Sequence, residues 1–263
     1  METDRQNPVW ISVIMPAYNS AAYIRQAIQS VYDQTIQEPL ELIVIDNGSS
    51  DETLSLIREE KRRWEQSGRA DRVLCLLHNE LPGVSKTRNM GMQYAKGKYL
   101  AFLDSDDLWD REKLEKQMHL FEEHPACRLV CSGRELIRAD GTATGRVIPV
   151  PEKIDYTMLL RGNQINCSSV VIEKELALRY PMEHDDSHED YIMWLRILKE
   201  GGYATAVNEP LLKTRLSAGG KSRNKIRSAY MTWKVYRYVG LSVPETCFYF
   251  LHYMIAGFRK YYG

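Results

Sequence analysis

The feature that most constrains the fold is a threefold alternation of apolar runs and amphipathic segments within the first 104 residues. Each run is almost continuously apolar, which is typical of a parallel strand buried on both faces. Between the runs, apolar residues recur with the spacing of a helix face. The four expected strands are VWISVIM (9–15), LELIVID (40–46), RVLCLLH (72–78) and KYLAFLD (98–104). This order predicts an α/β fold with a Rossmann-like, mostly parallel central sheet flanked by helices.

Polar residues gather where three of these strands end. PAYN (16–19) follows the first strand, Asp46 ends the second, and DSDD (104–107) follows the fourth. In an open parallel sheet, ligands bind in the crevice at the carboxyl ends of the strands. We therefore expect these segments to line one ligand crevice.

The pattern becomes less regular after Asp110. We expect helices over 111–124, 156–161 and 191–200, strands over 128–137 and 166–172, and a tight turn at Asp140-Gly141. The predicted domains are a catalytic domain, residues 1–220, and a C-terminal helical extension, residues 221–263. Within the catalytic domain, residues 1–107 form the nucleotide-binding half and residues 108–220 the acceptor-binding half.

Composition narrows the choice of partners. The 35 basic and 35 acidic residues balance, which argues against bulk electrostatic attraction to nucleic acid. The chain has no basic segment followed by an apolar stretch at its start and no run of roughly 18 apolar residues. Its five cysteines form no CxxC pair, which favours reduced thiols. We expect a cytoplasmic protein.

The segment DSDD places three carboxylates within four positions, at Asp104, Asp106 and Asp107. Their mutual repulsion is relieved if a divalent cation binds among them, and hard oxygen ligands select Mg²⁺ or Mn²⁺. A solvated turn in which Asp106 or Asp107 caps the following helix explains the same residues. From the DxD triplet alone, both interpretations stay open.

Four ordered motifs, PAYN, Asp46, GVSKTRN (83–89) and FLDSDD (102–107), together resemble the family 2 glycosyltransferases with the GT-A fold. HED (188–190) and TRLSAGGKS (214–222) extend the resemblance to residue 222. It implies an inverting, metal-dependent enzyme that transfers one sugar from a nucleotide-diphosphate sugar, expected to be a UDP-sugar, to an acceptor hydroxyl. Cell-surface polysaccharide or glycolipid synthesis is the expected setting.

The resemblance also implies roles for residues of the nucleotide site. Tyr18 would lie against the base, Asp46 would accept a hydrogen bond from the base, and Arg88 would contact base or phosphates. Each has a structural alternative, respectively a packed turn residue, a turn cap and a surface cation. The full predicted set is Pro16, Ala17, Tyr18, Asn19, Asp46, Arg88, Asp104 and Ser105 for the nucleotide, with Asp104 and Asp106 for the metal.

The acidic pair Glu189 and Asp190 precedes an aromatic helix. Inversion needs one base that removes the proton of the acceptor hydroxyl, and the resemblance implies Asp190 for this role. Glu189 would orient it or contact the sugar, although the base could be either residue of the pair. An acidic first turn that stabilises the helix is the structural alternative.

Arg215, Lys221 and Ser222 match a segment of the family that approaches the diphosphate. The intervening LSAGG lacks the histidine often found there, which weakens that assignment, but its two glycines suit a closing loop. The QxxRW segment of processive polysaccharide synthases is absent after the acidic pair, which favours one sugar per encounter.

Between Tyr230 and Tyr262, aromatic residues alternate with lysines and arginines. Such a segment suits an interfacial helix, so peripheral attachment to the inner membrane surface, with a lipid-linked saccharide as acceptor, is one expectation. Packing on the catalytic domain or on a second subunit of a homodimer is the other. Two different functions also remain, a nucleotide-sugar-binding protein without activity and a nucleotidyltransferase.

Overall fold

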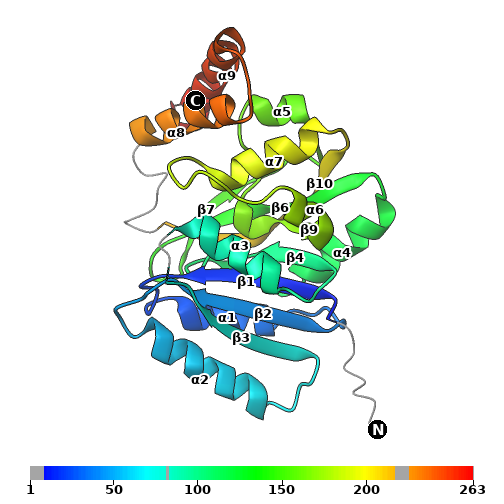
Figure 1. Ribbon diagram of the computed structural model, residues 1–263, viewed down its shortest axis with the longest axis vertical. Coiled ribbons are helices and arrows are strands. Elements are labelled where there is room, and N and C mark those ends of the chain that lie inside the picture. The colour runs from blue at the N-terminus through cyan, green and yellow to red at the C-terminus, as the bar shows by residue number, and fades with distance from the viewer. Residues whose placement is uncertain (1–8, 81–82, 217–224, 263) are drawn as a thin grey trace.

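The computed structural model describes residues 9–80, 83–216 and 225–262. Its centre is one large mixed sheet with helices on both faces (Figure 1). In the described part of the chain the sheet has ten strands, in the order β3-β2-β1-β4-β9-β6-β10-β5, with β7 paired to β6 and β8 to β10. The strands are β1 (Ile11–Ala17), β2 (Leu40–Asp46), β3 (Arg72–His78), β4 (Tyr99–Phe102), β5 (Leu108–Trp109), β6 (Cys127–Ile137), β7 (Ala143–Ile148), β8 (Lys153–Ile154), β9 (Val171–Glu173) and β10 (Tyr203–Arg215).

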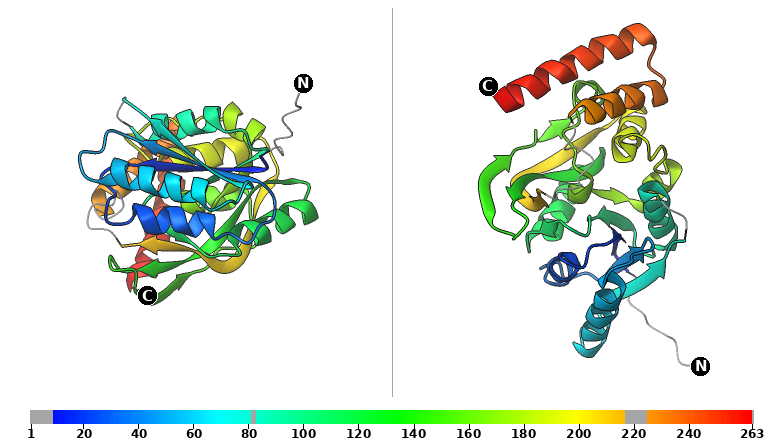
Figure 2. Two further views of the ribbon diagram at one scale, coloured as in Figure 1. Left: turned by 90° about the horizontal axis from the view of Figure 1, so that it is seen from below. Right: turned by 90° about the vertical axis from the view of Figure 1, so that its left-hand side faces the viewer.

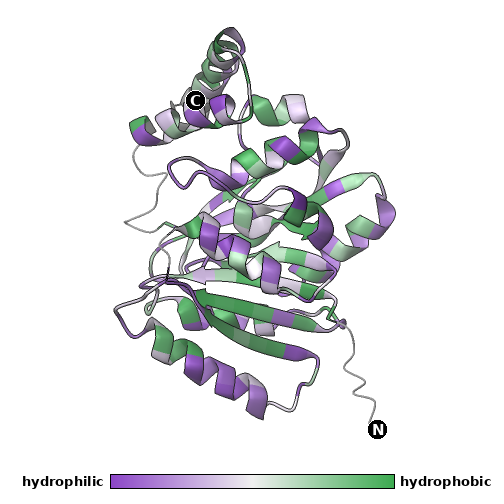
Figure 3. Ribbon diagram, viewed as in Figure 1, coloured by the Kyte–Doolittle hydropathy of each residue, from purple (hydrophilic) through white to green (hydrophobic). Residues whose placement is uncertain are grey.

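The first four strands form the predicted parallel half of the sheet. β1 pairs in parallel with both β2 and β4, and β2 pairs in parallel with β3. The hydropathy colouring shows β1 and β2 as apolar along most of their length (Figure 3), in agreement with their burial. The register places Ala17 beside Asp46 and Asp46 beside His78. The ends of these three strands therefore meet at one edge.

The other half of the sheet is mixed. β9 runs antiparallel to both β4 and β6, whereas β6 and β10 are parallel. β10, the longest strand of the described chain, is absent from the sequence prediction. Asn208 to Pro210 interrupt its apolar pattern with exposed residues, and its register against β6 shifts between Val207 and Leu212. Such an irregularity interrupts the regular pattern of apolar residues by which a strand is recognised in a sequence.

Helices cover the two faces with separate apolar cores. One core packs α1, α2 and α4 under the sheet, and the other packs α3, α5, α6 and α7 over it (Figure 2). The helices are α1 (Ile24–Tyr32), α2 (Thr53–Gln66), α3 (Val84–Tyr94), α4 (Lys113–Glu123), α5 (Tyr156–Leu160), α6 (Lys174–Arg179) and α7 (Glu189–Lys199).

Two further helices, α8 (Lys225–Tyr238) and α9 (Val243–Tyr262), form a hairpin at the end of the molecule opposite α2 (Figures 1 and 2). α8 packs against α7, so the extension predicted for residues 221–263 is helical where it is described. A domain boundary at residue 220 stays a prediction.

The strand predicted over residues 166–172 needs correction. Only its end becomes β9, because residues 167–169 form a 3₁₀ turn. The Asn166 side chain accepts a hydrogen bond from the Ser168 amide and begins that turn.

Candidate active site

The loops that follow β1, β2 and β4 are joined by hydrogen bonds. Asn19, which has a left-handed backbone with φ of 46°, accepts a hydrogen bond from the Ser50 amide at 2.9 Å. The next residue, Ser20, shares a hydrogen bond of 2.7 Å with Ser105 after β4. The segments that the sequence predicted to line one crevice therefore lie together at the carboxyl edge of the sheet.

Asp46 ends β2, the strand between β1 and β3, at this edge of the sheet. Its carboxylate is buried, with 1% of the side chain exposed, and Oδ2 is 3.2 Å from Nδ1 of His78. His78 ends the neighbouring strand β3 and is 53% exposed, and Tyr18, which follows β1 on the other side, is 61% exposed. An acceptor group therefore ends the strand that lies between those leading to His78 and Tyr18.

The sequence analysis had not included His78. The parallel register would have found it, because the strand RVLCLLH ends opposite Asp46.

Arg88 joins the two predicted halves of the catalytic domain. Its guanidinium, 5% exposed, donates to Oδ1 of Asp104 at 2.6 Å and to Oε1 of Glu189 at 2.8 Å. Asp104 follows β4, whereas Glu189 begins α7, so one side chain connects the metal motif to the acidic pair. Arg88 is therefore a buried bridge and not the surface cation that the sequence left as an alternative.

Arg215, at the end of β10, organises the backbone around Asp106. Its guanidinium donates to the carbonyls of Asp106 at 2.8 Å and Ala139 at 2.8 Å, and it lies over the ring of Tyr23. Its backbone amide donates to Oδ1 of Asp107 at 2.9 Å. These bonds hold the loop after β4 in place, and a contact with the diphosphate stays a prediction. Lys221 and Ser222 lie outside the described residues.

The three carboxylates of DSDD lie in different environments. Asp107 is buried, and burial together with the charges of Asp104 and Asp106 raises its pKa well above the ordinary value. The side chain of Asp104 is 40% exposed, and Asp106 is partly exposed. Asp107 is therefore a buried acceptor within the fold, whereas Asp104 and Asp106 are the two carboxylates of this segment that reach the surface.

The same residues allow a test of the expected divalent cation. Across residues 9–80, 83–216 and 225–262, no group of three or more His, Cys, Asp or Glu side chains could hold a metal by itself. Asp104 already accepts a hydrogen bond from Arg88. This donor set fits Mg²⁺ or Mn²⁺ bound through one or two carboxylates, because such ions take their remaining ligands from water and substrate phosphates.

Glu189 and Asp190 form the first turn of α7, two residues earlier than the sequence predicted. Burial raises the pKa of Asp190, and the neighbouring charge of Glu189 raises it further, while Arg88 lowers it. Its Oδ1 accepts the Tyr191 amide at 2.8 Å. Asp190 thus has a raised pKa and lies in the first turn of α7 beside the Arg88 bridge.

The acidic segment before α7 is attached at both sides. Asp185 accepts hydrogen bonds from the amide and hydroxyl of Ser85, in the first turn of α3, at 2.8 and 2.7 Å. On the other side, Asp186 pairs with Lys234 of α8 at 2.6 Å. These partners are about 50 and 100 residues away along the chain, so no local sequence pattern indicates them.

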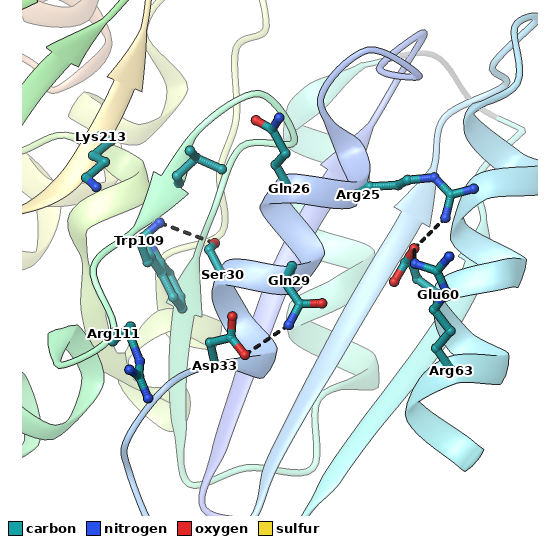
Figure 4. A pocket seen from close by; sticks show the side chains of 11 residues that line it. Arg25, Gln26, Gln29, Ser30, Asp33, Glu60, Arg63, Trp109, Arg111 and Lys213 are labelled. Carbon is teal, nitrogen blue, oxygen red and sulfur yellow. Dashed lines mark hydrogen bonds and ion pairs between the residues drawn. The ribbon is translucent and has the colours of Figure 1, made fainter. Parts of the chain in front are cut away.

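A separate surface pocket of about 460 Å³ lies among α1, α2 and β5 (Figure 4). Arg25 and Arg63 line it, and both pair with Glu60, at 2.6 and 2.7 Å. None of the predicted site residues lines this pocket. Its ion pairs join α1 and α2.

Comparison with solved structures shows which fold this is. The structure aligns with S. aureus TarS residues 1–349 in complex with UDP-GlcNAc, with a TM-score of 0.71 and 19% identity over 95% of this chain and 73% of that one. It also aligns with the mannosyltransferase PcManGT of Pyrobaculum calidifontis, in complex with GDP-Man and Mn²⁺, with a TM-score of 0.67 and 21% identity over 92% of this chain and 68% of that one. The predicted GT-A fold is confirmed.

Sequence comparison gives the family. TuaG of Bacillus subtilis, named as a teichuronic acid biosynthesis glycosyltransferase, is 35% identical over 86% of this chain and 87% of its own length. WfaP of Escherichia coli, a UDP-Glc:α-D-GlcNAc-diphosphoundecaprenol β-1,3-glucosyltransferase, is 30% identical over 95% of both chains. The model of glycosyl transferase family 2 matches residues 12–172. This chain belongs to glycosyl transferase family 2, and it is a glycosyltransferase with the GT-A fold.

Proposed function

We propose that this glycosyltransferase moves a single sugar from a UDP-sugar to an acceptor hydroxyl, with inversion at the anomeric carbon and with Mn²⁺ or Mg²⁺. The observation that carries the proposal is the Arg88 bridge. It joins Asp104, at the nucleotide edge of the sheet, to Glu189, which adjoins the proposed base. Through these two ion pairs, Arg88 connects the proposed donor site to the acidic pair that contains the proposed base.

The nucleobase is assigned to the space beside Asp46. Its buried carboxylate would accept an N–H of the base, which uracil offers and which suits an acceptor-only group. Tyr18 and His78 are exposed rings on the neighbouring strand ends, where they can contact the faces of the base. The UDP-sugar named for WfaP supports the choice of nucleotide. Pro16, Ala17, Asn19 and Ser105 complete the site.

Asp190 is assigned as the base. Its carboxylate takes the proton of the acceptor hydroxyl while the oxygen forms a bond to the anomeric carbon. The bond from that carbon to the diphosphate oxygen breaks at the same time, and its electron pair leaves with the diphosphate. Glu189 is held by Arg88 at 2.8 Å, and its charge raises the pKa of Asp190 so that the base is stronger.

Asp106, with Asp104 beside it, is the proposed holder of the divalent ion. When bound, the ion would neutralise the departing diphosphate. Mn²⁺ in the PcManGT complex supports this choice. Arg215 positions Asp106 through the backbone, since its guanidinium binds the Asp106 carbonyl.

The acceptor is proposed to be a saccharide, free or lipid-linked, in the synthesis of a cell-surface polymer. The names of TuaG and WfaP support this setting. A single transfer per encounter fits the absence of the processive QxxRW segment.

A binding panel followed by two variants tests the proposal. In thermal-shift measurements, a UDP-sugar with Mn²⁺ should raise the melting temperature more than GDP- or ADP-sugars do. Asp106→Ala should remove the metal-dependent part of this shift, whereas Asp140→Ala, an exposed turn aspartate, should keep it. Asp190→Asn should keep donor binding and lose transfer. Full transfer by Asp190→Asn would refute the base assignment, and equal shifts with all nucleotides would refute the choice of UDP.

A further inference from the structure

Between Phe248 and Ile255, the solvent-exposed side chains of α9 are apolar. The exposed fractions are 55% for Phe248, 61% for Leu251, 48% for Met254 and 44% for Ile255. These residues are three, four and seven positions apart, so they lie on one side of the helix. A continuous apolar strip on a surface marks a site of interaction and not a random set of exposed side chains.

The opposite side of the same helix is the one that packs on the protein. Thr246 is fully buried, and Tyr249 and Phe250 contact the core that includes Tyr236 of α8. The helix is therefore attached in a defined orientation. The apolar strip is turned outward because polar and aromatic residues already fill the inward side.

We propose that this outward strip of α9 docks onto an anionic lipid bilayer and lies in the plane of the headgroups. α9 is about 30 Å long, but no described helix is sufficiently apolar to cross a membrane. An outward apolar strip on such a helix is the arrangement of an interfacial helix. On α8, Ile226 and Tyr230 are also exposed, at 84% and 60%, and they add apolar surface to the hairpin.

Charge decides between a bilayer and a second copy of the chain. Although the whole sequence is neutral, the hairpin has an excess of cations, with Glu245 as its one acidic residue. Its six basic residues are Lys225, Arg227, Lys234, Arg237, Arg259 and Lys260, of which Lys234 is paired with Asp186 outside the hairpin, so that basic residues still outnumber the acidic ones. A symmetric dimer through this face would bring two cationic hairpins together, whereas an anionic membrane complements them.

Docking through the hairpin would also orient the active site. Asp186 pairs with Lys234 of α8, and the ring of His184 stacks on Tyr238 with centroids 3.7 Å apart. The same segment leads directly into Glu189 and Asp190 at the start of α7. A hairpin held at the membrane would therefore keep the proposed base close to the surface where a lipid-linked acceptor is found.

Vesicle flotation tests the docking. The full chain should float with vesicles of equimolar phosphatidylcholine and phosphatidylglycerol, and more weakly with phosphatidylcholine alone. The double variant Phe248→Glu, Leu251→Glu should bind at least ~10-fold more weakly, since two apolar anchors become charged. Leu178→Glu on α6 is the matched control, because Leu178 is 41% exposed on another helix and should not affect binding.

Cys247 supplies a second measurement on the same strip. It is exposed on α9, so a soluble maleimide should label it in solution, and the anionic vesicles should protect it. Absence of flotation, unchanged flotation of the double variant, or labelling at the same rate on vesicles would overturn the docking. If the unmodified chain is a dimer that does not bind vesicles, and the double variant is a monomer, the strip is a contact between copies of the chain.

Bilayer docking requires none of the donor chemistry proposed above. A chain that floats but binds no UDP-sugar would refute the proposed donor alone, and a chain that binds UDP-sugar without floating would refute the docking alone.

Discussion

Removing the charge of Arg88 should destabilise the protein strongly. Methionine has a similar length but no charge, so Arg88→Met removes the ion pairs that this arginine forms with Asp104 and Glu189. Glu189, 8% exposed, then remains buried and charged, and a buried pair broken at one partner typically costs about 3–5 kcal/mol. Asp104 is 40% exposed and can be hydrated, so its share is at most about 1 kcal/mol. We expect the free energy of unfolding to fall by at least about 3 kcal/mol, the lower end of that range.

Urea denaturation, with the slope of the transition compared between variants, measures this loss. The melting temperature should fall by roughly 6–12 °C in a chain of this size. Lys116→Met is a matched control, because Lys116 also pairs with two carboxylates, Glu112 at 2.8 Å and Glu209 at 2.7 Å. These three side chains are 33 to 55% exposed, so the control should lose less than about 1 kcal/mol.

A double variant separates the effect of breaking the Arg88–Glu189 ion pair from the effect of changing the packing at position 88. Arg88→Met combined with Glu189→Gln has no buried charge at position 189, and it should therefore be more stable than Arg88→Met alone. If Arg88→Met costs less than ~1 kcal/mol, or if the two substitutions are simply additive, the bridge is not the buried ion pair that the structure describes.

Three further predictions concern the base, the nucleotide and the core. A base acts only when it is ionised, and burial raises the pKa of Asp190. We therefore expect kcat/KM, measured in a pH–rate profile, to decline with falling pH through a pKa above about 3.9. A flat profile would exclude Asp190 as the base. His78→Ala should weaken UDP binding severalfold by calorimetry, while His119→Ala, a 70% exposed histidine on α4, should not; equal affinities would remove His78 from the site. Gly91→Ala would place a Cβ 2.7 Å from Ile14, so it should lower the free energy of unfolding in urea by about 1–3 kcal/mol. In the control Gly162→Ala, the added Cβ meets nothing within 4 Å, and the free energy of unfolding should hardly change.

The sequence predicted the parallel half of the sheet well because its strands are buried on both faces. LELIVID and RVLCLLH coincide with β2 and β3. The first strand was placed two residues early, because Pro16 was taken as its end. Pro16 nevertheless lies in β1, between Met15 and Ala17. The convergence of PAYN, Asp46 and DSDD at one edge followed from parallel topology alone.

The sequence could not predict contacts that depend on distant segments. Arg88 was assigned to a ligand, and its partner Glu189 is 101 residues away, so nothing in the local pattern indicates the ion pair. β10 was missed because exposed residues interrupt it within the sheet. In both cases the missing information is the packing of the second half of the chain on the first, which a local period does not contain.

Besides Asp46, the site contains five carboxylates whose environments differ. Burial raises the pKa of Asp107, and its carboxylate accepts a hydrogen bond from the Arg215 amide. Glu189 and Asp104 are neutralised together by Arg88. Asp106 is partly exposed at the sheet edge, and Asp190 lies in the first turn of α7 with a raised pKa. Carboxylates in different environments can take different tasks at one pH, so the exposure of Asp106 supports it as the proposed ligand of the cation, and the raised pKa of Asp190 supports it as the proposed base.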